Sequence, residues 1–166
     1  ASLPKGSEGR RVRTRAAERI RSFSSTRGRI LIVDEGREVR QQLSDLLGGR
    51  GFDVDVASSA EAALKKVEGH LYDAVFVDLM LRRTGGLELL HQIFRLRPEA
   101  SVVIMSRDGS LDSSEKALKQ GASHYLKKPV DEEILDVILR SCMERSRLLQ
   151  LNAELQQKTI QDDLTA

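Results

Sequence analysis

The chain has 166 residues, 40% of them hydrophobic, and its 27 basic and 25 acidic side chains give a formal net charge of +2. This length suits one domain of ordinary size with short appendages. No apolar run approaches the roughly 18 residues that cross a membrane, and no apolar secretory signal opens the chain. We therefore expect a cytoplasmic protein without a membrane partner, and the single cysteine, Cys142, agrees with a reducing compartment.

The positive charge is concentrated in the first 27 residues, which hold eight basic and two acidic side chains. The composition changes near Thr26, so we expect a basic tail or linker over residues 1–27 and a folded domain over residues 28–143. The tail has several interpretations: the last helix of an upstream domain, a surface-binding arm, a disordered tail or a transit peptide. No helix-turn-helix pattern or aromatic platform is visible, so nucleic acid is not the expected partner.

The first half of the predicted domain contains three strand-like runs. Residues 29–33, RILIV, form the first run, and the amphipathic stretch after it predicts a helix that ends at a glycine cluster. The second run covers residues 53–57, and Ser58 with Glu61 has the spacing of a capping box that opens the next helix. The third run, residues 74–77, is wholly apolar, which is typical of a buried parallel strand.

The second half continues the alternation. The expected elements are a helix ending at Arg97 before Pro98, a strand over residues 102–105, a helix over about 112–120 and a strand over 125–126. Five strands that alternate with five helices predict right-handed crossovers and a parallel sheet covered on both faces. The expected fold class is therefore α/β, a flavodoxin-like doubly wound (βα)5 domain with an extended C-terminal helix.

Acidic residues stand where the first and third strands end. Asp34 and Glu35 directly follow RILIV, and Asp78 directly follows AVFV. The flavodoxin-like strand order 2-1-3-4-5 would place these strands side by side, with their carboxyl ends at the ligand crevice. Carboxylates held so close need a compensating cation, and Mg²⁺ is a hard ion that prefers oxygen ligands. The sequence therefore predicts a site that binds Mg²⁺ and handles phosphate.

From Arg29 to about Met143 the chain resembles a response regulator receiver domain, the phosphoacceptor module of two-component systems. Each residue that carries the resemblance has an ordinary explanation alone, such as a helix cap, a strand residue or a solvated charge. Together they stand in the expected order at the strand ends. They are Asp34-Glu35, Asp78, Gly86, Ser106 and Lys128-Pro129.

The resemblance implies a chemistry for these residues. Asp78 would be the phosphoacceptor, a carboxylate nucleophile that attacks a phosphohistidine on a histidine kinase or histidine phosphotransfer protein. Mg²⁺ would be held by Asp34, Glu35, Asp78 and the backbone carbonyl of Met80. Lys128 would bond a phosphoryl oxygen.

A switch pair is also implied by the resemblance. The hydroxyl of Ser106 would reach the new phosphoryl oxygens, and its displacement would leave space for the ring of Tyr125 to turn inward. Phosphorylation would thus bias a two-state element for a downstream effector domain or protein. The expected role is a signalling switch and not a turnover enzyme.

Two other functions stay open at this point. One is a pseudo-receiver that keeps the fold as a phosphorylation-independent interaction or dimerisation module. The other is a haloacid-dehalogenase-like phosphatase, which also uses an aspartyl nucleophile and Mg²⁺. Such a phosphatase normally has a second aspartate two residues after its nucleophile, a position occupied here by Met80.

Two arginines depart from the family pattern. Members commonly have proline at the position of Arg82 and a small residue at that of Arg107. We expect Arg107 to narrow access to Asp78 or to pair with its phosphoryl group. Either effect predicts that Arg107→Ala changes the lifetime of the acyl phosphate.

The C-terminal segment lacks glycine and proline from Asp131, a suitable helix cap, to about residue 160. About 30 helical residues would extend about 45 Å, longer than the last helix of a receiver. The apolar residues expected to pack on the sheet are Ile134, Val137 and Ile138, and those at heptad spacing are Leu148, Leu151 and Leu155. Residues 144–166 are then either a signalling helix that pairs in a homodimeric coiled coil or a frayed, truncated linker.

Overall fold

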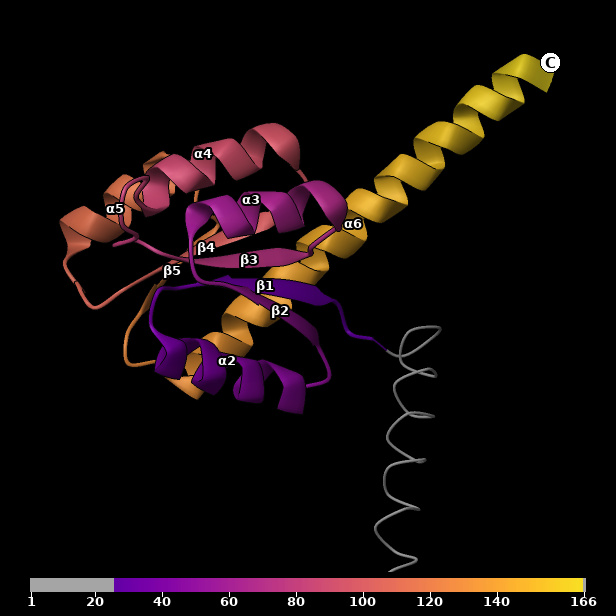
Figure 1. The fold of residues 1–166 in the computed structure, drawn as a ribbon. Coiled ribbons are helices and arrows are strands. Elements are labelled where there is room, and N and C mark those ends of the chain that lie inside the picture. The colour runs from indigo at the N-terminus through magenta and orange to yellow at the C-terminus, as the bar shows by residue number, and fades with distance from the viewer. Residues whose placement is uncertain (1–25, 166) are drawn as a thin grey trace, which may run out of the picture.

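A five-stranded parallel sheet forms the centre of the molecule (Figure 1). The computed structural model describes residues 26–165, with side chains described up to residue 159. The strands are β1 (Arg29–Val33), β2 (Asp53–Ala57), β3 (Ala74–Asp78), β4 (Ser101–Ser106) and β5 (His124–Lys127). They lie in the order β2-β1-β3-β4-β5, and every neighbouring pair is parallel. The predicted fold class and strand order are confirmed.

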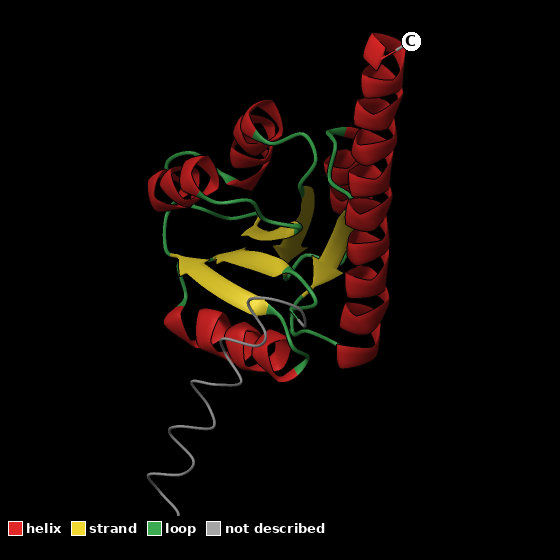
Figure 2. Cartoon of the chain, turned by 90° about the vertical axis from the view of Figure 1, so that its right-hand side faces the viewer, coloured by secondary structure: helices red, strands yellow, loops and turns green. Residues whose placement is uncertain are grey.

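Helices cover both faces of the sheet (Figure 2). They are α2 (Arg37–Gly49), α3 (Ala60–Gly69), α4 (Gly86–Leu96), α5 (Leu111–Lys119) and α6 (Glu132–Thr165). Buried residues of α3, α4 and α5 pack on one face, and those of α2 and α6 pack on the other. The sheet is therefore the middle of three layers, and its carboxyl edge lies between the two helical layers.

The burial of the central strands explains why their sequences are continuous apolar runs. Side chains alternate between the two faces of a strand, so Leu31 and Val33 enter one core while Ile30 and Ile32 enter the other. Because both faces are covered, β1, β3 and β4 have almost no position that meets water. This double burial fixes the register that brings the polar strand ends together.

Helix caps agree with the sequence at one helix and differ at another. The carboxylate of Asp131 accepts a 2.9 Å hydrogen bond from the amide of Glu133, which confirms Asp131 as the cap of α6. At α3 the cap is Ser59, whose hydroxyl accepts a 3.2 Å hydrogen bond from the amide of Ala62. The predicted capping box beginning at Ser58 was therefore wrong by one residue.

Helix α6 is continuous for 34 residues and extends beyond the rest of the domain (Figure 1). It crosses the predicted domain boundary after residue 143 without a break. Ile138 is buried against the sheet as expected, but Ile134 and Val137 are 52% and 63% exposed, so the prediction that they pack there was wrong. The buried residues of this helix are Leu135, Ile138, Leu139 and Cys142.

Polar contacts fix α6 where it passes the amino end of the sheet. The Arg145 guanidinium donates to the carbonyls of Glu99 at 2.7 Å and Pro98 at 3.1 Å. The hydroxyl of Ser146 donates to the carboxylate of Asp73, the residue before β3. No helix in the part of the chain that the structure describes is apolar enough to cross a bilayer. The predicted basic tail lies almost wholly outside the described residues.

Candidate functional site

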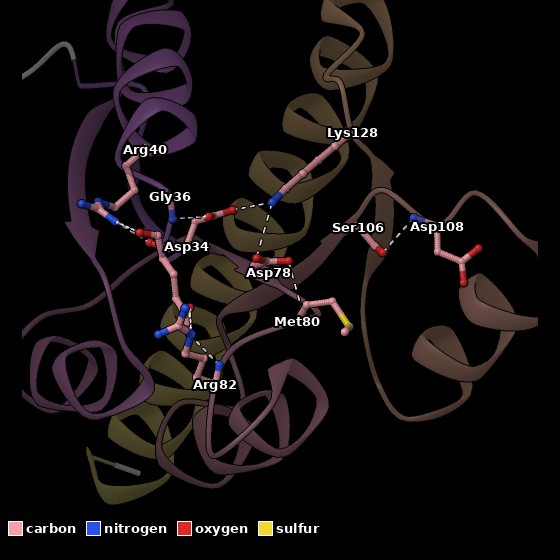
Figure 3. A network of polar contacts seen from close by, with 10 residues as sticks. Asp34, Gly36, Arg40, Asp78, Met80, Arg82, Ser106, Asp108 and Lys128 are labelled. Carbon is pink, nitrogen blue, oxygen red and sulfur yellow. Dashed lines mark hydrogen bonds and ion pairs between the residues drawn. The ribbon is translucent and has the colours of Figure 1, made fainter.

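The ammonium group of Lys128 lies between two carboxylates at the carboxyl edge of the sheet (Figure 3). Its Nζ atom is 2.5 Å from Oδ2 of Asp34 and 3.5 Å from Oδ2 of Asp78. Asp34 follows β1, Asp78 ends β3 and Lys128 follows β5. The parallel register therefore brings together three residues that are far apart in the sequence, as the expected site requires.

These three side chains are largely removed from water. The side chains of Asp34, Lys128 and Asp78 are 4%, 12% and 15% exposed. In such surroundings two carboxylates repel strongly, and one ammonium offsets only one of the two negative charges. The site therefore retains an excess of negative charge and favours a further cation.

Glu35 turns away from this group toward the loop after β3. One oxygen of its carboxylate accepts the amide hydrogen of Arg82, and the other lies 3.2 Å from Nε of Arg82. The main chain beside it is also fixed, because Arg40 donates 2.8 Å hydrogen bonds to the carbonyls of Asp34 and Glu35. Sequence reasoning missed Arg40. The only sign of Arg40 in the sequence is a basic residue in the helix that follows the acidic pair Asp34-Glu35.

The backbone next to Asp78 is closely packed. The Met80 amide donates to Oδ1 of Asp78 at 3.2 Å, and the Gly86 amide donates to the carbonyl of Leu79 at 3.0 Å. A Cβ atom added to Gly86 would lie 2.5 Å from the Asp78 carbonyl oxygen. Glycine at this position therefore lets the start of α4 approach the end of β3, which gives Gly86 a structural role beside Asp78.

The two expected switch residues are linked through Asp108. The hydroxyl of buried Ser106 accepts a 3.0 Å hydrogen bond from the amide of Asp108. The carbonyl of Asp108 accepts a hydrogen bond from the half-buried hydroxyl of Tyr125 at 2.5 Å, and Ser113 lies 3.0 Å from the same hydroxyl. Sequence reasoning did not find Asp108, since its role rests on main-chain atoms.

The carboxylate of Asp108 is held locally. The amide of Ser110 donates to it at 2.8 Å, and this hydrogen bond lowers the pKa of Asp108 below its ordinary value. The loop after β4 thus has its own polar structure beside Ser106.

The turn after β5 places Lys128. Its amide donates to the carbonyl of Ser106 at 2.7 Å, and the Lys128–Pro129 peptide bond is cis. Exposed Arg107 lines a cavity with Lys128 and Pro129. Arg107 thus lies beside the site, and its effect on a phosphoryl group stays a prediction.

The donor set fits Mg²⁺ in part. Asp34 and Asp78 offer carboxylate oxygens, and Mg²⁺ commonly uses one or two carboxylates together with waters and a phosphate. Among residues 26–159, however, no group of three His, Cys, Asp or Glu side chains is arranged to hold a metal. The Glu35 carboxylate contacts Arg82. The predicted three-carboxylate cluster is therefore present as two carboxylates around Lys128, with the third held apart.

The sequence of the chain is similar to that of known proteins. Residues 30–140 match the family described as the response regulator receiver domain. The nitrogen assimilation regulatory protein NtrX of Azorhizobium caulinodans is 33% identical over 132 residues, which cover 78% of this chain and 29% of that protein. The transcriptional regulatory protein ZraR of Klebsiella oxytoca is 35% identical over 72% of this chain and 27% of its own length. The chain thus spans less than a third of these relatives.

Solved structures give the same result. NtrX from Brucella abortus, crystallised in complex with ATP, superposes with a TM-score of 0.72 at 28% identity, covering 77% of this chain and 29% of that one. A CheY-like receiver domain protein from Methanospirillum hungatei gives a TM-score of 0.65 at 30% identity over 72% of this chain and 96% of its own length. The sequence match over residues 30–140 and the shared fold show that this chain belongs to the response regulator receiver domain family.

Proposed function

We propose that the chain accepts a phosphoryl group on Asp78 from a histidine kinase or a histidine phosphotransfer protein and signals through a conformational change. The observation that carries the proposal is the position of Lys128, whose ammonium lies 2.5 Å from Asp34 and 3.5 Å from Asp78. A lysine between two mostly buried carboxylates, together with a divalent cation bound by them, supports a site for a phosphoryl group. The role is that of a signalling switch and not of a turnover enzyme.

The reaction is a transfer between two protein side chains. A carboxylate oxygen of Asp78 forms the new bond to phosphorus, the bond from phosphorus to the donor imidazole nitrogen breaks, and the imidazole leaves with the electron pair and takes up a proton. Lys128 has donors to spare for a phosphoryl oxygen because its contact with Asp78 is long. Asp34 and Asp78 would hold Mg²⁺, which neutralises charge on the transferring group.

Asp108 gives the proposed switch a route. A phosphoryl oxygen on Asp78 would accept a hydrogen bond from the hydroxyl of Ser106, and the movement of Ser106 toward it would weaken the hydrogen bond that the same hydroxyl accepts from the amide of Asp108. Movement of Ser106 loosens the loop whose Asp108 carbonyl accepts the hydrogen bond from Tyr125. The Tyr125 ring is then free to turn inward, which changes the surface formed by α5 and β5.

Labelling with a small acyl phosphate donor tests the proposal. The wild-type chain gains one phosphoryl group in a reaction that needs Mg²⁺, and Asp78→Ala gains none. Asp73→Ala is the matched control because Asp73 precedes the same strand at its opposite end. Equal labelling of the wild type and Asp78→Ala would contradict Asp78 as the acceptor, and no labelling of either chain would favour a phosphorylation-independent pseudo-receiver.

The apolar outer stripe of α6 supports a second proposal, that the chain forms a homodimer through this helix. Ser141 and Glu144 interrupt a heptad series whose apolar members are all exposed. These members are Ile134, Val137, Leu148, Leu151 and Leu155. They are exposed and lie outside the buried face of α6, so a second copy can pair there without disturbing the core.

Sedimentation over a range of concentrations tests the dimer. The full chain is expected to associate, and a chain ending at Arg145 is expected to sediment as a monomer. If the full chain and the chain ending at Arg145 both sediment as monomers at every concentration, pairing through the helix is refuted. The downstream effector domain or protein would then receive the signal without a coiled coil.

A further inference from the structure

Arg82 engages both carboxylate oxygens of Glu35, one through its main-chain amide and the other through its guanidinium. One oxygen accepts the Arg82 amide hydrogen, and the other is 3.2 Å from the guanidinium Nε. The Glu35 side chain is 32% exposed and that of Arg82 is 89% exposed. The pair therefore lies at the rim of the site, where its strength depends on salt.

The surroundings leave the side chain of Glu35 as the movable part. Its carbonyl and that of Asp34 are each fixed by a 2.8 Å hydrogen bond from Arg40. The amide of Gly36 is fixed as well, by a 2.8 Å hydrogen bond to Asp34. Only rotation about the side-chain bonds of Glu35 can bring its carboxylate toward Asp34 and Asp78.

The acidic residues of the site are thus divided between two cations. Lys128 contacts Asp34 and Asp78 (Figure 3). Arg82 instead contacts Glu35. A divalent ion that recruits Glu35, directly or through a bound water, must compete with the Arg82 guanidinium. Proline would remove both the guanidinium and the amide hydrogen, whereas any other residue would keep the amide hydrogen. The ion pair with Glu35 therefore depends on the arginine in this chain.

We propose that Arg82 is a positioning residue that holds Glu35 away from the metal site and lowers the affinity of the site for Mg²⁺. The inference rests on the proposed function, because it assumes that Mg²⁺ binds at Asp34 and Asp78. Binding of Mg²⁺ and release of the loop after β3 are then linked events. Each makes the other more favourable.

Titration of the ¹⁵N-labelled chain with MgCl₂ at low ionic strength, followed by NMR, tests the proposal without a phosphorylation assay. Arg82→Ala is expected to lower the Kd for Mg²⁺ about two- to fivefold, the range that an exposed ion pair supplies. In the wild type, Mg²⁺ is expected to move the Arg82 amide proton upfield, as its hydrogen bond to Glu35 breaks. Glu35→Gln should move it in the same direction without metal.

Two controls separate the ion pair from general electrostatics. Arg37→Ala removes an exposed positive charge two residues after Glu35 and is expected to change the Kd much less. In the Glu35→Gln background, Arg82→Ala is expected to have little effect, because the two substitutions remove the same interaction.

The possible failures are distinguishable. An unchanged Kd in Arg82→Ala, equal tightening in Arg37→Ala, or a full Arg82 effect in the Glu35→Gln background would each overturn the role of Arg82. In each of these cases the proposed metal site is still supported if the wild-type chain binds Mg²⁺ and Asp34→Asn does not. If the wild-type chain and Arg82→Ala both fail to bind Mg²⁺, the metal site and the Arg82 proposal fall together.

Discussion

Strand β3 has an aspartate at each end, and the two carboxylates are held in different ways. Before the strand, Asp73 accepts a hydrogen bond from the Ser146 hydroxyl and a 2.8 Å hydrogen bond from the Arg29 amide. At its other end, Asp78 has a 3.2 Å bond from the Met80 amide and a 3.5 Å contact with Lys128. The donors at Asp73 are neutral and close, whereas those at Asp78 are longer and include a cation.

This difference separates a structural carboxylate, Asp73, from the proposed phosphoacceptor, Asp78. Asp73 uses both oxygens to join β1, β3 and α6, so a new bond at either oxygen would break a contact of the fold. Asp78 can form a bond to phosphorus while its neighbours only adjust. The amino end of the sheet therefore anchors the long helix α6, and the carboxyl end is available for the proposed phosphoryl transfer.

Removal of the lysine should have the largest effect on the carboxyl end. Lys128→Met keeps much of the side-chain volume but leaves Asp34 and Asp78 without their cation. We expect a loss of about 3 kcal/mol in the free energy of unfolding, measured with urea, and loss of phosphoryl labelling. Lys127→Met, at an exposed neighbouring position, should change stability by less than about 0.5 kcal/mol. Equal losses in both variants would show that the pairing of Lys128 adds nothing.

The close approach of α4 can be tested next. Gly86→Ala places a methyl group 2.5 Å from the Asp78 carbonyl oxygen, and we expect it to cost about 2 kcal/mol by overpacking. Gly48→Ala is the control because a Cβ atom there meets nothing within 4 Å, and helix propensity predicts a gain of about 0.5 kcal/mol. Urea unfolding measures both, and a neutral Gly86→Ala would mean that the loop moves away without cost.

A substitution at the amino end of β3 should lower the stability of the fold without affecting phosphoryl labelling at Asp78. Asp73→Ala leaves the Arg29 amide and the Ser146 hydroxyl without their acceptor, so we expect a loss of about 1.5 kcal/mol. Hydrogen exchange in α6 beyond Ser146 should become faster, while labelling at Asp78 persists. Asp53→Ala, at an exposed position of β2, is the control. Loss of labelling in Asp73→Ala would break the proposed division between the two ends.

Alkaline pH is expected to lower the stability by a smaller amount, through Cys142 near the amino end of the sheet. Burial raises the pKa of Cys142 from 9.0 to about 11, so the unfolded chain loses the thiol proton at lower pH than the folded chain. This contribution to stability is complete below pH 9 and is lost as the pH rises toward 11. At pH 10 the loss is about 1 kcal/mol. Unfolding curves of the wild type and Cys142→Ala between pH 8 and 10 measure it, and identical slopes would contradict this role of burial.

The sequence was sufficient for the sheet because its signals are strong and local. Continuous apolar runs reveal doubly covered strands, and the order of Asp34, Asp78 and Lys128 along them is specific. The phase of α6 was harder, since apolar residues occupy positions 134, 135, 137, 138 and 139 and suit more than one face. Only packing against the sheet selects Leu135, Ile138 and Leu139.

The contact between Glu35 and Arg82 could not be predicted for a different reason. It joins a long exposed side chain to a residue 47 positions away, and no periodicity or composition records such a contact. The links through Asp108 depend on main-chain atoms of a loop, which any residue type provides. Sequence patterns led to the proposed reacting groups, and the structure was needed for the residues that hold them.

The most direct test of the account is to locate the phosphoryl group. After reaction with a small acyl phosphate donor and Mg²⁺, borohydride reduction converts a phosphorylated aspartate to homoserine, which peptide mass spectrometry can place in the sequence. The account predicts homoserine at position 78 and an unmodified residue at 73. Homoserine at any other aspartate, with position 78 unmodified, would contradict the assignment of Asp78 as phosphoacceptor.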